Sequence, residues 1–204
     1  MNTITFKIYV TVKNLPESWD LVAASNHFLQ SPYLQVLENA APINMKCFYI
    51  GIFENNILIG VALAQYLNLN DLESFGDRES CFKTYVRNLI FRKFASHVLF
   101  LGNNMITGQN AFTFSKEVHF KDVSNLLMNC SKELIAYFKA KGTKIHMVSF
   151  KDFYKESAYN LRKYAFKSLY EFDTQPNMVF NLDLNWNTKE DYVNAFTKKY
   201  RNDY

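Results

Sequence analysis

The sequence predicts a mixed α/β fold in which helices flank a central, mixed but mostly antiparallel sheet. Three observations lead to this prediction. The first twelve residues alternate apolar with polar or aromatic side chains, and two later strand-like segments follow one another across a short polar turn. One long amphipathic helix then lies between further strand-like segments. This order of elements mixes antiparallel with parallel strand pairing.

The composition predicts a single, well-packed domain. Of the 204 residues, 49% are hydrophobic and 17% aromatic, so the chain can bury one full-sized core. Nineteen Phe and thirteen Tyr against six Gly predict tight packing, because each aromatic ring carries a large apolar area that needs cover. The formal charge of +4 is modest, so nucleic acid is not the default partner.

The three cysteines, Cys47, Cys81 and Cys130, predict neither a disulfide framework nor a metal site. They are odd in number and far apart, and a reducing compartment is the simplest interpretation. The chain start lacks the continuous apolar segment of a signal peptide. No window approaches the roughly 20 apolar residues of a membrane-spanning helix. We therefore expect a soluble, cytoplasmic protein with no membrane span and no metal.

The first forty residues predict one strand and two short helices. Residues 1–12 alternate in the manner of a strand. Pro16 carries a helix-start signal, and Ser31-Pro32 repeats it. Two short helices should therefore follow the first strand.

A hairpin is predicted next. Residues 46–53 and 57–67 are strand-like runs, and residues 54–56 form a polar turn of the length that joins antiparallel strands. The second run is apolar on both faces, which predicts a central strand covered on both sides. Charges accumulate within residues 68–96, where we expect a surface excursion.

The second half of the chain begins with a strand over residues 97–102 and a long helix that starts near Asp122. Gly142 stands where a C-terminal cap belongs. Cys130 lies on the apolar stripe of this helix and is predicted to be a core residue. The stripe consists of Val123, Leu126, Leu127, Cys130, Leu134, Ile135 and Phe138.

Residues 144–150 then read as a buried strand, residues 155–166 as a helix and residues 178–184 as a strand whose Phe180, Leu182 and Leu184 point inward. Residues 187–190 resemble a capping box. A last helix follows and runs to the end of the chain without a stop signal. Its apolar face holds Tyr192, Val193, Phe196 and Tyr200.

The predicted order of elements resembles the GNAT acyltransferase fold. The helix that follows residues 144–150 ends in Lys163-Tyr164-Ala165-Phe166, which is similar to the Lys-x-Gly-Phe pattern of many GNAT enzymes with Ala165 in place of Gly. Residues 192–201 look like the helix that opens the linker or second half of Fem-type peptidoglycan aminoacyltransferases, which carry two such domains.

This resemblance implies a domain organisation, and the composition suggests a source. Residues 1–186 would form the GNAT-like domain, and residues 187–204 would begin a linker helix or a second domain that continues beyond this chain. Richness in Asn, Lys, Tyr and Phe further suggests an AT-rich bacterial genome.

The resemblance also implies an acyl or aminoacyl transferase that moves an acyl group to an amine acceptor. In the family, backbone amides between a central strand and a long helix hold the pyrophosphate of an acyl-CoA donor. The family's Gln/Arg-x-x-Gly-x-Gly/Ala spacing would put Met105 first and Asn110 last, and both depart from it. A carrier-linked donor, such as a charged tRNA, is the alternative to acyl-CoA. The candidate cofactor-binding residues are Asn103, Asn104, Thr107, Gly108, Lys151 and Lys155.

Asp152 and Tyr164 are the candidate catalytic residues. Asp152 follows a strand at its carboxyl end, where ligands collect in such sheets, and could serve as a general base or cap the next helix. The position of the family's general-acid Tyr is taken by Leu161. On a helix, Tyr159 and Tyr164 would point about 160° and about 60° away from it.

Other general-base candidates have weaker positions. His146 is expected in mid-strand as a core histidine, which leaves two further candidates. These are Glu156 and His119.

Eight Lys or Arg against two acids between residues 139 and 167 form a basic patch. The patch could attract an anionic donor, and a solvated helix face explains it equally well. Two main hypotheses stay open: a transferase completed by a C-terminal half, and a non-catalytic GNAT-like structural or ligand-recognition domain. Met105, Asn110 and Leu161 favour the second. Nucleic-acid binding rests on the basic patch alone.

Overall fold

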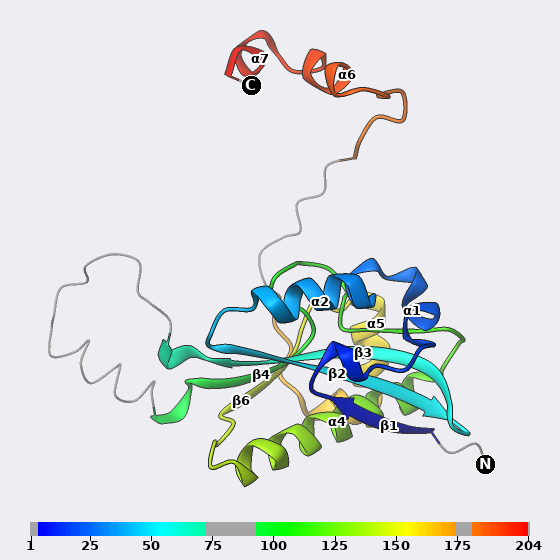
Figure 1. The fold of residues 1–204 in the computed structure, drawn as a ribbon, viewed down its shortest axis with the longest axis vertical. Coiled ribbons are helices and arrows are strands. Elements are labelled where there is room, and N and C mark those ends of the chain that lie inside the picture. Colours follow the sequence, from blue (N-terminus) through cyan, green and yellow to red (C-terminus); the bar gives the residue numbers. More distant parts are fainter. Residues whose placement is uncertain (1–3, 72–92, 174–180, 204) are drawn as a thin grey trace, which may run out of the picture. The chain divides into compact units, whose positions relative to one another are not determined.

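The computed structural model describes residues 4–71, 93–173 and 181–203, and it divides the chain into two compact units. Met1–Glu171 form the first and Phe172–Tyr204 the second. The first unit is a mixed sheet with helices on both faces (Figure 1). The predicted fold class is therefore confirmed, whereas the predicted boundary between residues 186 and 187 stays a prediction.

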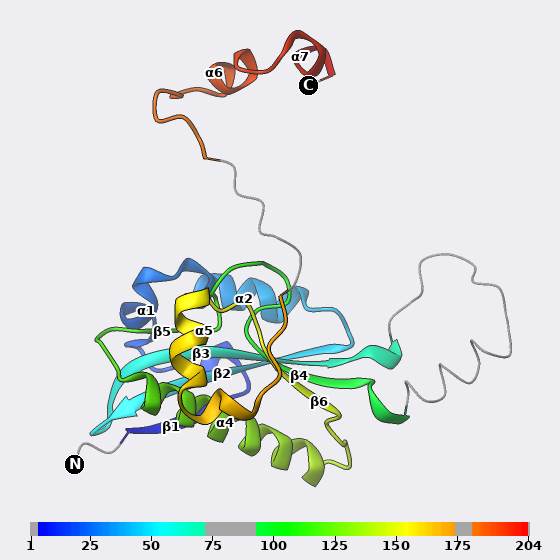
Figure 2. The same cartoon turned by 180° about the vertical axis from the view of Figure 1, so that it is seen from behind.

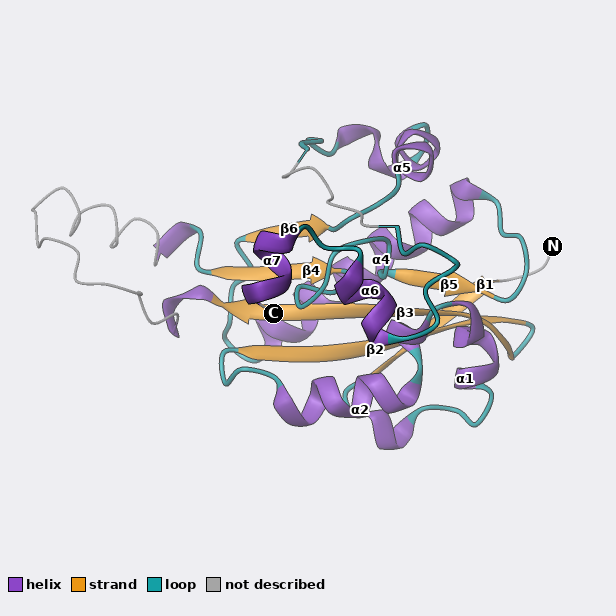
Figure 3. Cartoon of the chain, turned by 90° about the horizontal axis from the view of Figure 1, so that it is seen from above, coloured by secondary structure: helices purple, strands orange, loops and turns teal. Residues whose placement is uncertain are grey.

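The sheet has the order β1-β2-β3-β4-β6, and β5 also pairs with β3 (Figure 3). Among the described strands, every pair is antiparallel except β4 with β6, which are parallel. The strands are β1 Ile4–Tyr9, β2 Met45–Glu54, β3 Ile57–Asn68, β4 His97–Leu101, β5 Phe112–Phe114 and β6 Met147–Phe150.

The predicted hairpin is confirmed as β2 and β3. Its turn places Asn55 at φ +49° and Asn56 at φ +66°. Positive φ at both central residues is the geometry that matches the twist of paired strands, and Asn adopts it more readily than most residues. β3 is also covered on both faces, as predicted: Ala62 and Ala64 join one core, and Val61 and Leu63 join the other.

β3 carries two short strands in one line along its second edge. Residues 64–68 of β3 pair with β4, and residues 60–62 pair with β5. β5 is an additional strand between the predicted strand over residues 97–102 and the long helix. The chain between β4 and β5 must therefore leave the sheet and return to it at Leu63.

Helices on the two faces bury two separate cores. Helices α1 and α2 lie on one face with Trp19, Leu29 and Leu34 beneath them, while α4 and α5 cover the other face (Figures 1 and 2). The Trp19 indole donates to the Leu29 carbonyl at 2.8 Å, so the ring is fully buried without an unpaired donor. The helices are α1 Trp19–Val22, α2 Ser31–Ala40, α4 Phe120–Ala140 and α5 Lys155–Arg162.

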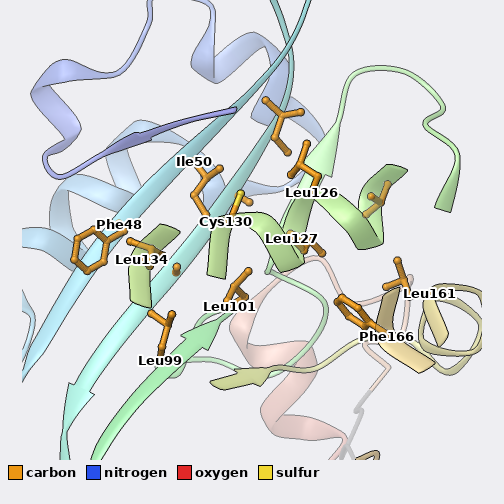
Figure 4. Packing of buried hydrophobic residues seen from close by; sticks show 14 of the residues in the cluster. Phe48, Ile50, Leu99, Leu101, Leu126, Leu127, Cys130, Leu134, Leu161 and Phe166 are labelled. Carbon is orange, nitrogen blue, oxygen red and sulfur yellow. The ribbon is translucent and has the colours of Figure 1, made fainter. Parts of the chain in front are cut away.

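The long helix α4 follows its predicted stripe. Every member of that stripe is buried except Ile135, which is partly buried against the same core. Gly142 adopts φ +78° just after the helix, as a C-terminal cap requires. Cys130 is fully buried against the sheet, which confirms it as core, and burial raises its pKa (Figure 4).

Several elements of the first unit are shorter than predicted: β1 ends at Tyr9 rather than at residue 12, β4 ends at Leu101 rather than at residue 102, and β6 and α5 are also shorter. β6 begins at Met147, so His146 precedes the strand and is only partly buried rather than a mid-strand core residue. α5 ends at Arg162, because Tyr164 adopts φ −123° and ψ −128°, a backbone conformation that cannot continue a helix. The 3-10 helix Ala165–Ser168 follows and buries Phe166.

The second unit corrects further predictions. Residues 178–180 lie outside the described part, but residues 181–184 are not a strand, and Leu182 and Leu184 are 68% and 98% exposed. The Asp183 carboxylate accepts the Asn185 N–H at 2.9 Å, and such a local turn competes with strand pairing. The capping box is formed by Thr188 and Asp191, one residue later than predicted.

The last predicted helix is broken into two. α6 spans Lys189–Asn194 and α7 spans Lys198–Asp203. The Arg201 guanidinium donates to the carbonyls of Asn194 and Phe196 at 3.0 and 2.9 Å, which satisfies carbonyls at the end of α6. Across the residues that the structure describes, none of the helices combines the length and apolarity needed to span a bilayer.

Candidate functional site

The candidate site lies at the carboxyl ends of the parallel strands β4 and β6. The two strands remain paired up to the Lys151 N–H, which donates to the Leu101 carbonyl at 2.9 Å. Beyond that bond the chain after β4 enters residues 102–111, here called the 102–111 loop, and the chain after β6 enters α5. Ligands commonly bind at this edge of α/β sheets.

Both ends of the 102–111 loop are attached to one residue of β3. The Gly102 N–H donates to the Leu63 carbonyl at 3.0 Å, and the Leu63 N–H donates to the Ala111 carbonyl at 2.9 Å. A compact loop whose ends meet in this way is an Ω-loop. The loop therefore projects from a fixed base at the middle of the sheet.

Asn103 and Asn104 anchor the first half of the loop. The Asn103 amide donates to the Tyr33 hydroxyl at 3.0 Å, and its side-chain oxygen accepts the Met105 N–H at 2.9 Å. The Asn104 N–H donates to the side-chain oxygen of Gln65 at 2.7 Å. Gln65 is fully buried in β3, and sequence reasoning missed it, although a lone polar side chain within an apolar strand was a usable signal.

One side-chain donor in the loop has no hydrogen-bond acceptor among the described residues. The side-chain nitrogen of Asn104 is buried and meets no acceptor among the described residues. A buried polar group without a partner costs free energy, so such atoms commonly mark a place where another molecule completes the hydrogen bonding. Asn104 is therefore the residue of the loop that is best placed to meet a ligand oxygen.

Lys151 and Asp152 stand opposite the loop. The Lys151 ammonium donates to the Ile106 carbonyl at 3.2 Å and forms an ion pair with the Asp152 carboxylate. Asp152 adopts φ +57°, a left-handed conformation that is uncommon for residues other than glycine and that recurs at functional sites.

The alternative role of Asp152 as a helix cap is wrong. The residue at the N-cap of α5 is Tyr154, and Asp152 bonds to Lys151 instead. The Tyr154 N–H donates to the side-chain oxygen of Gln109 at 2.9 Å, which ties the start of α5 to the 102–111 loop.

The second half of the loop is a tight turn. Gly108 adopts φ +94°, and its carbonyl accepts the Asn110 N–H at 2.9 Å, while the Thr107 carbonyl accepts the Asn110 side-chain amide at 3.0 Å. Asn110, which departs from the family spacing, is thus a buried structural residue of the turn. Thr107 is exposed beside it, and Lys155 is exposed at the first position of α5.

Tyr164 is not brought to Asp152. It lies beyond the carboxyl end of α5, whereas Asp152 precedes the helix, and the eight residues of α5, about 12 Å long, stand between them in the chain. The Tyr164 ring is partly buried and packs edge-on against His119 at 5.5 Å. Leu161 is fully buried, and Tyr159 is exposed with the Lys163 ammonium 4.3 Å from its ring centre, so neither joins the site.

The contacts of the other general-base candidates, where the structure gives them, are with residues outside the 102–111 loop. The His119 ring accepts the Lys121 N–H at 3.1 Å and so caps α4, and Glu156 is an exposed residue of α5. The His146 ring accepts the His97 N–H at 3.3 Å, at the amino ends of β4 and β6. Desolvation, His97 and Lys144 together lower the pKa of His146.

The predicted basic patch does not form a single surface. Lys139 lies in the last turn of α4, and Lys141 and Lys144 lie between α4 and β6, whereas Lys151 and Lys155 follow β6. The two groups therefore lie at opposite ends of that strand. Two of the charges are also engaged in ion pairs, because Lys151 pairs with Asp152 and Arg162 pairs with Glu171.

Two surface hollows lie away from the candidate site. The larger, of about 440 Å³, runs between β1 and α4, and the smaller, of about 300 Å³, lies beside the start of β2. Neither is lined by a predicted site residue, so the chemistry of the 102–111 loop, and not hollow size, defines the candidate site. Within the described ranges, the His, Cys, Asp and Glu side chains form no group of three that could hold a metal ion.

The fold and this edge define a mixed α/β domain with an open, mostly antiparallel sheet and an Ω-loop at its parallel strand ends. No family model, curated protein or solved structure matches the chain. The GNAT and Fem resemblance therefore stays a prediction that rests on the sequence pattern.

Proposed function

We propose that this chain is a domain of a GNAT- or Fem-like transferase that moves an acyl or aminoacyl group to an amine. The observation that carries the proposal is the meeting of the 102–111 loop with Lys151 and Asp152 at the carboxyl ends of β4 and β6. This edge combines a carboxylate, a cation and an unpaired amide donor within one short stretch of structure.

Asp152 is the proposed general base. An amine attacks the acyl carbon only as the neutral species, so a carboxylate that takes a proton from the bound ammonium promotes the reaction. The new C–N bond forms as the bond from the acyl carbon to the leaving oxygen or sulfur breaks, and the proton finally passes to that leaving atom. Lys151 holds the Asp152 carboxylate in place.

The donor is proposed to lie along the 102–111 loop. The Asn104 side-chain amide would donate to an oxygen of the donor, with Asn103, Thr107 and Gly108 shaping the loop around it. The exposed Lys155 would supply a positive charge for a phosphate group. Acyl-CoA and a carrier-linked donor such as a charged tRNA both carry such groups. Tyr164 takes no part in this step because it lies beyond the far end of α5.

A titration of this chain with acetyl-CoA and with free CoA tests the proposal, by thermal shift and by calorimetry. A ligand at 100 times its Kd stabilises the folded state by about 2.7 kcal/mol, which is easily measured. We expect Lys155→Glu to weaken CoA binding in a salt-dependent way and Asp152→Asn to leave CoA binding intact. No shift at millimolar ligand would remove CoA as the donor.

The alternative is a non-catalytic GNAT-like recognition domain. Its supporting observations are the buried Leu161 at the position of the family's general acid and the internal bonding of Asn103 and Asn110. In that case ligand binding would occur without any acyl transfer to an amine, both in this chain and in a longer protein that contains it. Asp152→Asn would then change no measured activity.

A further inference from the structure

The free edge of the sheet is β1. It pairs with β2 from Ile4 opposite Glu54 to Tyr9 opposite Tyr49, and no other described strand pairs with it. In an antiparallel pair, alternate residues direct their N–H and C=O groups away from the partner. The outer side of β1 therefore offers a row of backbone donors and acceptors to a further strand.

The larger surface hollow runs along this same edge. Its one wall is residues 4–6 of β1, and its other wall is a single face of α4 that includes Asp122, Leu126 and Glu133. Leu126 is buried, and Ile4 and Phe6 are partly buried, so the floor is apolar. Asn125 and Asn129 add side-chain amides to the α4 wall.

The hollow carries two free negative charges. Asp122 and Glu133 are exposed, and neither takes part in an ion pair within the described part of the chain. They are eleven residues apart on α4, which corresponds to about 16 Å along the helix. Lys121 and Lys132 precede them in the sequence, but adjacent helix positions point about 100° apart, and neither lysine lines the hollow.

We propose that an extended basic segment of a partner protein binds in this hollow and adds to β1 as a strand. Residues of a strand that share a face are about 7 Å apart, so basic side chains at positions i and i+4 stand about 13 Å apart. Long, flexible Lys or Arg side chains cover the remaining distance to Asp122 and Glu133. The residue at i+2 would be apolar and would pack over Leu126, Ile4 and Phe6.

A second copy of this chain fits the hollow less well. Symmetric antiparallel pairing of two β1 strands places both copies of α4 on the same side of the joined sheet, so like charges would approach one another. The cation of β1, Lys7, alternates with Ile4 and Phe6 and points to the opposite face, away from Asp122 and Glu133. Charge complementarity therefore selects a separate, basic strand.

Fluorescence anisotropy with a labelled peptide tests this proposal. The probe is acetyl-Thr-Lys-Thr-Val-Thr-Lys-Thr-Val-amide, and its counterpart carries Glu in place of both Lys. We expect the Lys peptide to bind and the Glu peptide not to bind. The double variant Asp122→Lys, Glu133→Lys should weaken binding of the Lys peptide at least about tenfold, because two attractions become repulsions. Glu17→Lys, a single charge reversal at an exposed position before α1, should leave binding unchanged.

Two Lys peptides with N-methyl groups test the strand pairing itself. One carries them on its odd residues and the other on its even residues, so each loses the donors of one edge. Only one of the two should lose binding, since a strand offers one edge to β1. Equal binding of both, or no binding of the Lys peptide at millimolar concentration, would overturn the proposal. So would sedimentation showing that the chain self-associates through a contact that the double variant abolishes.

Discussion

Replacing Gln65 with Leu is the sharpest perturbation of the candidate site. The substitution keeps the size of a fully buried side chain in β3 but removes the oxygen that accepts the Asn104 N–H at 2.7 Å. The Asn104 N–H would then be left without its partner. An unsatisfied buried donor costs about 1–3 kcal/mol, so Gln65→Leu should lower the free energy of unfolding by about that amount.

A domain of this size shifts its Tm by about 2–4 °C for each kcal/mol, so the expected loss is about 2–12 °C. Gln35→Leu is the matched control, because Gln35 is on α2 and its side-chain bond to Asn39 is exposed. That change should remain within about 0.5 kcal/mol of the parent.

Urea unfolding gives the stability, and hydrogen exchange gives the local effect. In Gln65→Leu, the backbone N–H of Asn104 should exchange faster than in the parent. The exchange rates of backbone N–H groups in the middle of α4 should change only as far as the global free energy of unfolding changes. If Gln65→Leu were as stable as Gln35→Leu and the Asn104 amide stayed protected, the role assigned to Gln65 in fixing the 102–111 loop would be refuted.

Three further predictions follow from burial and charge. Folding lowers the pKa of His146, so the unfolded chain binds a proton at this residue at a higher pH than the folded protein does. The free energy of unfolding should therefore fall as the pH drops below about 6.5. Urea titrations at pH 7.5 and 5.5 should show a smaller loss for His146→Gln. Burial raises the pKa of Cys47 to about 11, so mass spectrometry should show slower alkylation of native Cys47 at pH 8 than after unfolding in urea; equal rates would contradict its burial. Leu127→Ala should cost about 2–5 kcal/mol in the α4 core, whereas Leu182→Ala, at an exposed site of the second unit, should cost less than about 0.5 kcal/mol by the same urea assay.

Local patterns predicted much of the sheet and the long helix. The hairpin of β2 and β3 could be predicted because the Asn55-Asn56 turn and the flanking apolar runs are all adjacent in the sequence. The stripe on α4 could be predicted because a helix repeats its buried face every three or four residues. In both cases, the interactions that decide the structure lie within a few residues of one another.

Long-range contacts limited the prediction of the candidate site. The position of Asp152 at the carboxyl end of β6 followed from the strand pattern, but its partner depended on where the 102–111 loop returns to the sheet. Gln65 and Asn104 are 39 residues apart, and no local signal pairs them. The end of α5 also depended on packing, since the chain turns at Tyr164 and buries Phe166 in the 3-10 helix that follows.

Because both ends of the 102–111 loop are attached to Leu63, the geometry of the sheet does not depend on the length of the loop. Because β4 and β5 are held on β3 independently, the two ends of the loop keep their positions whatever lies between them. The entropy of closing such a loop grows only with the logarithm of its length, and each doubling costs about 0.6 kcal/mol. Loops of different length and composition can therefore join β4 to β5 at the middle of this sheet without a change in the scaffold.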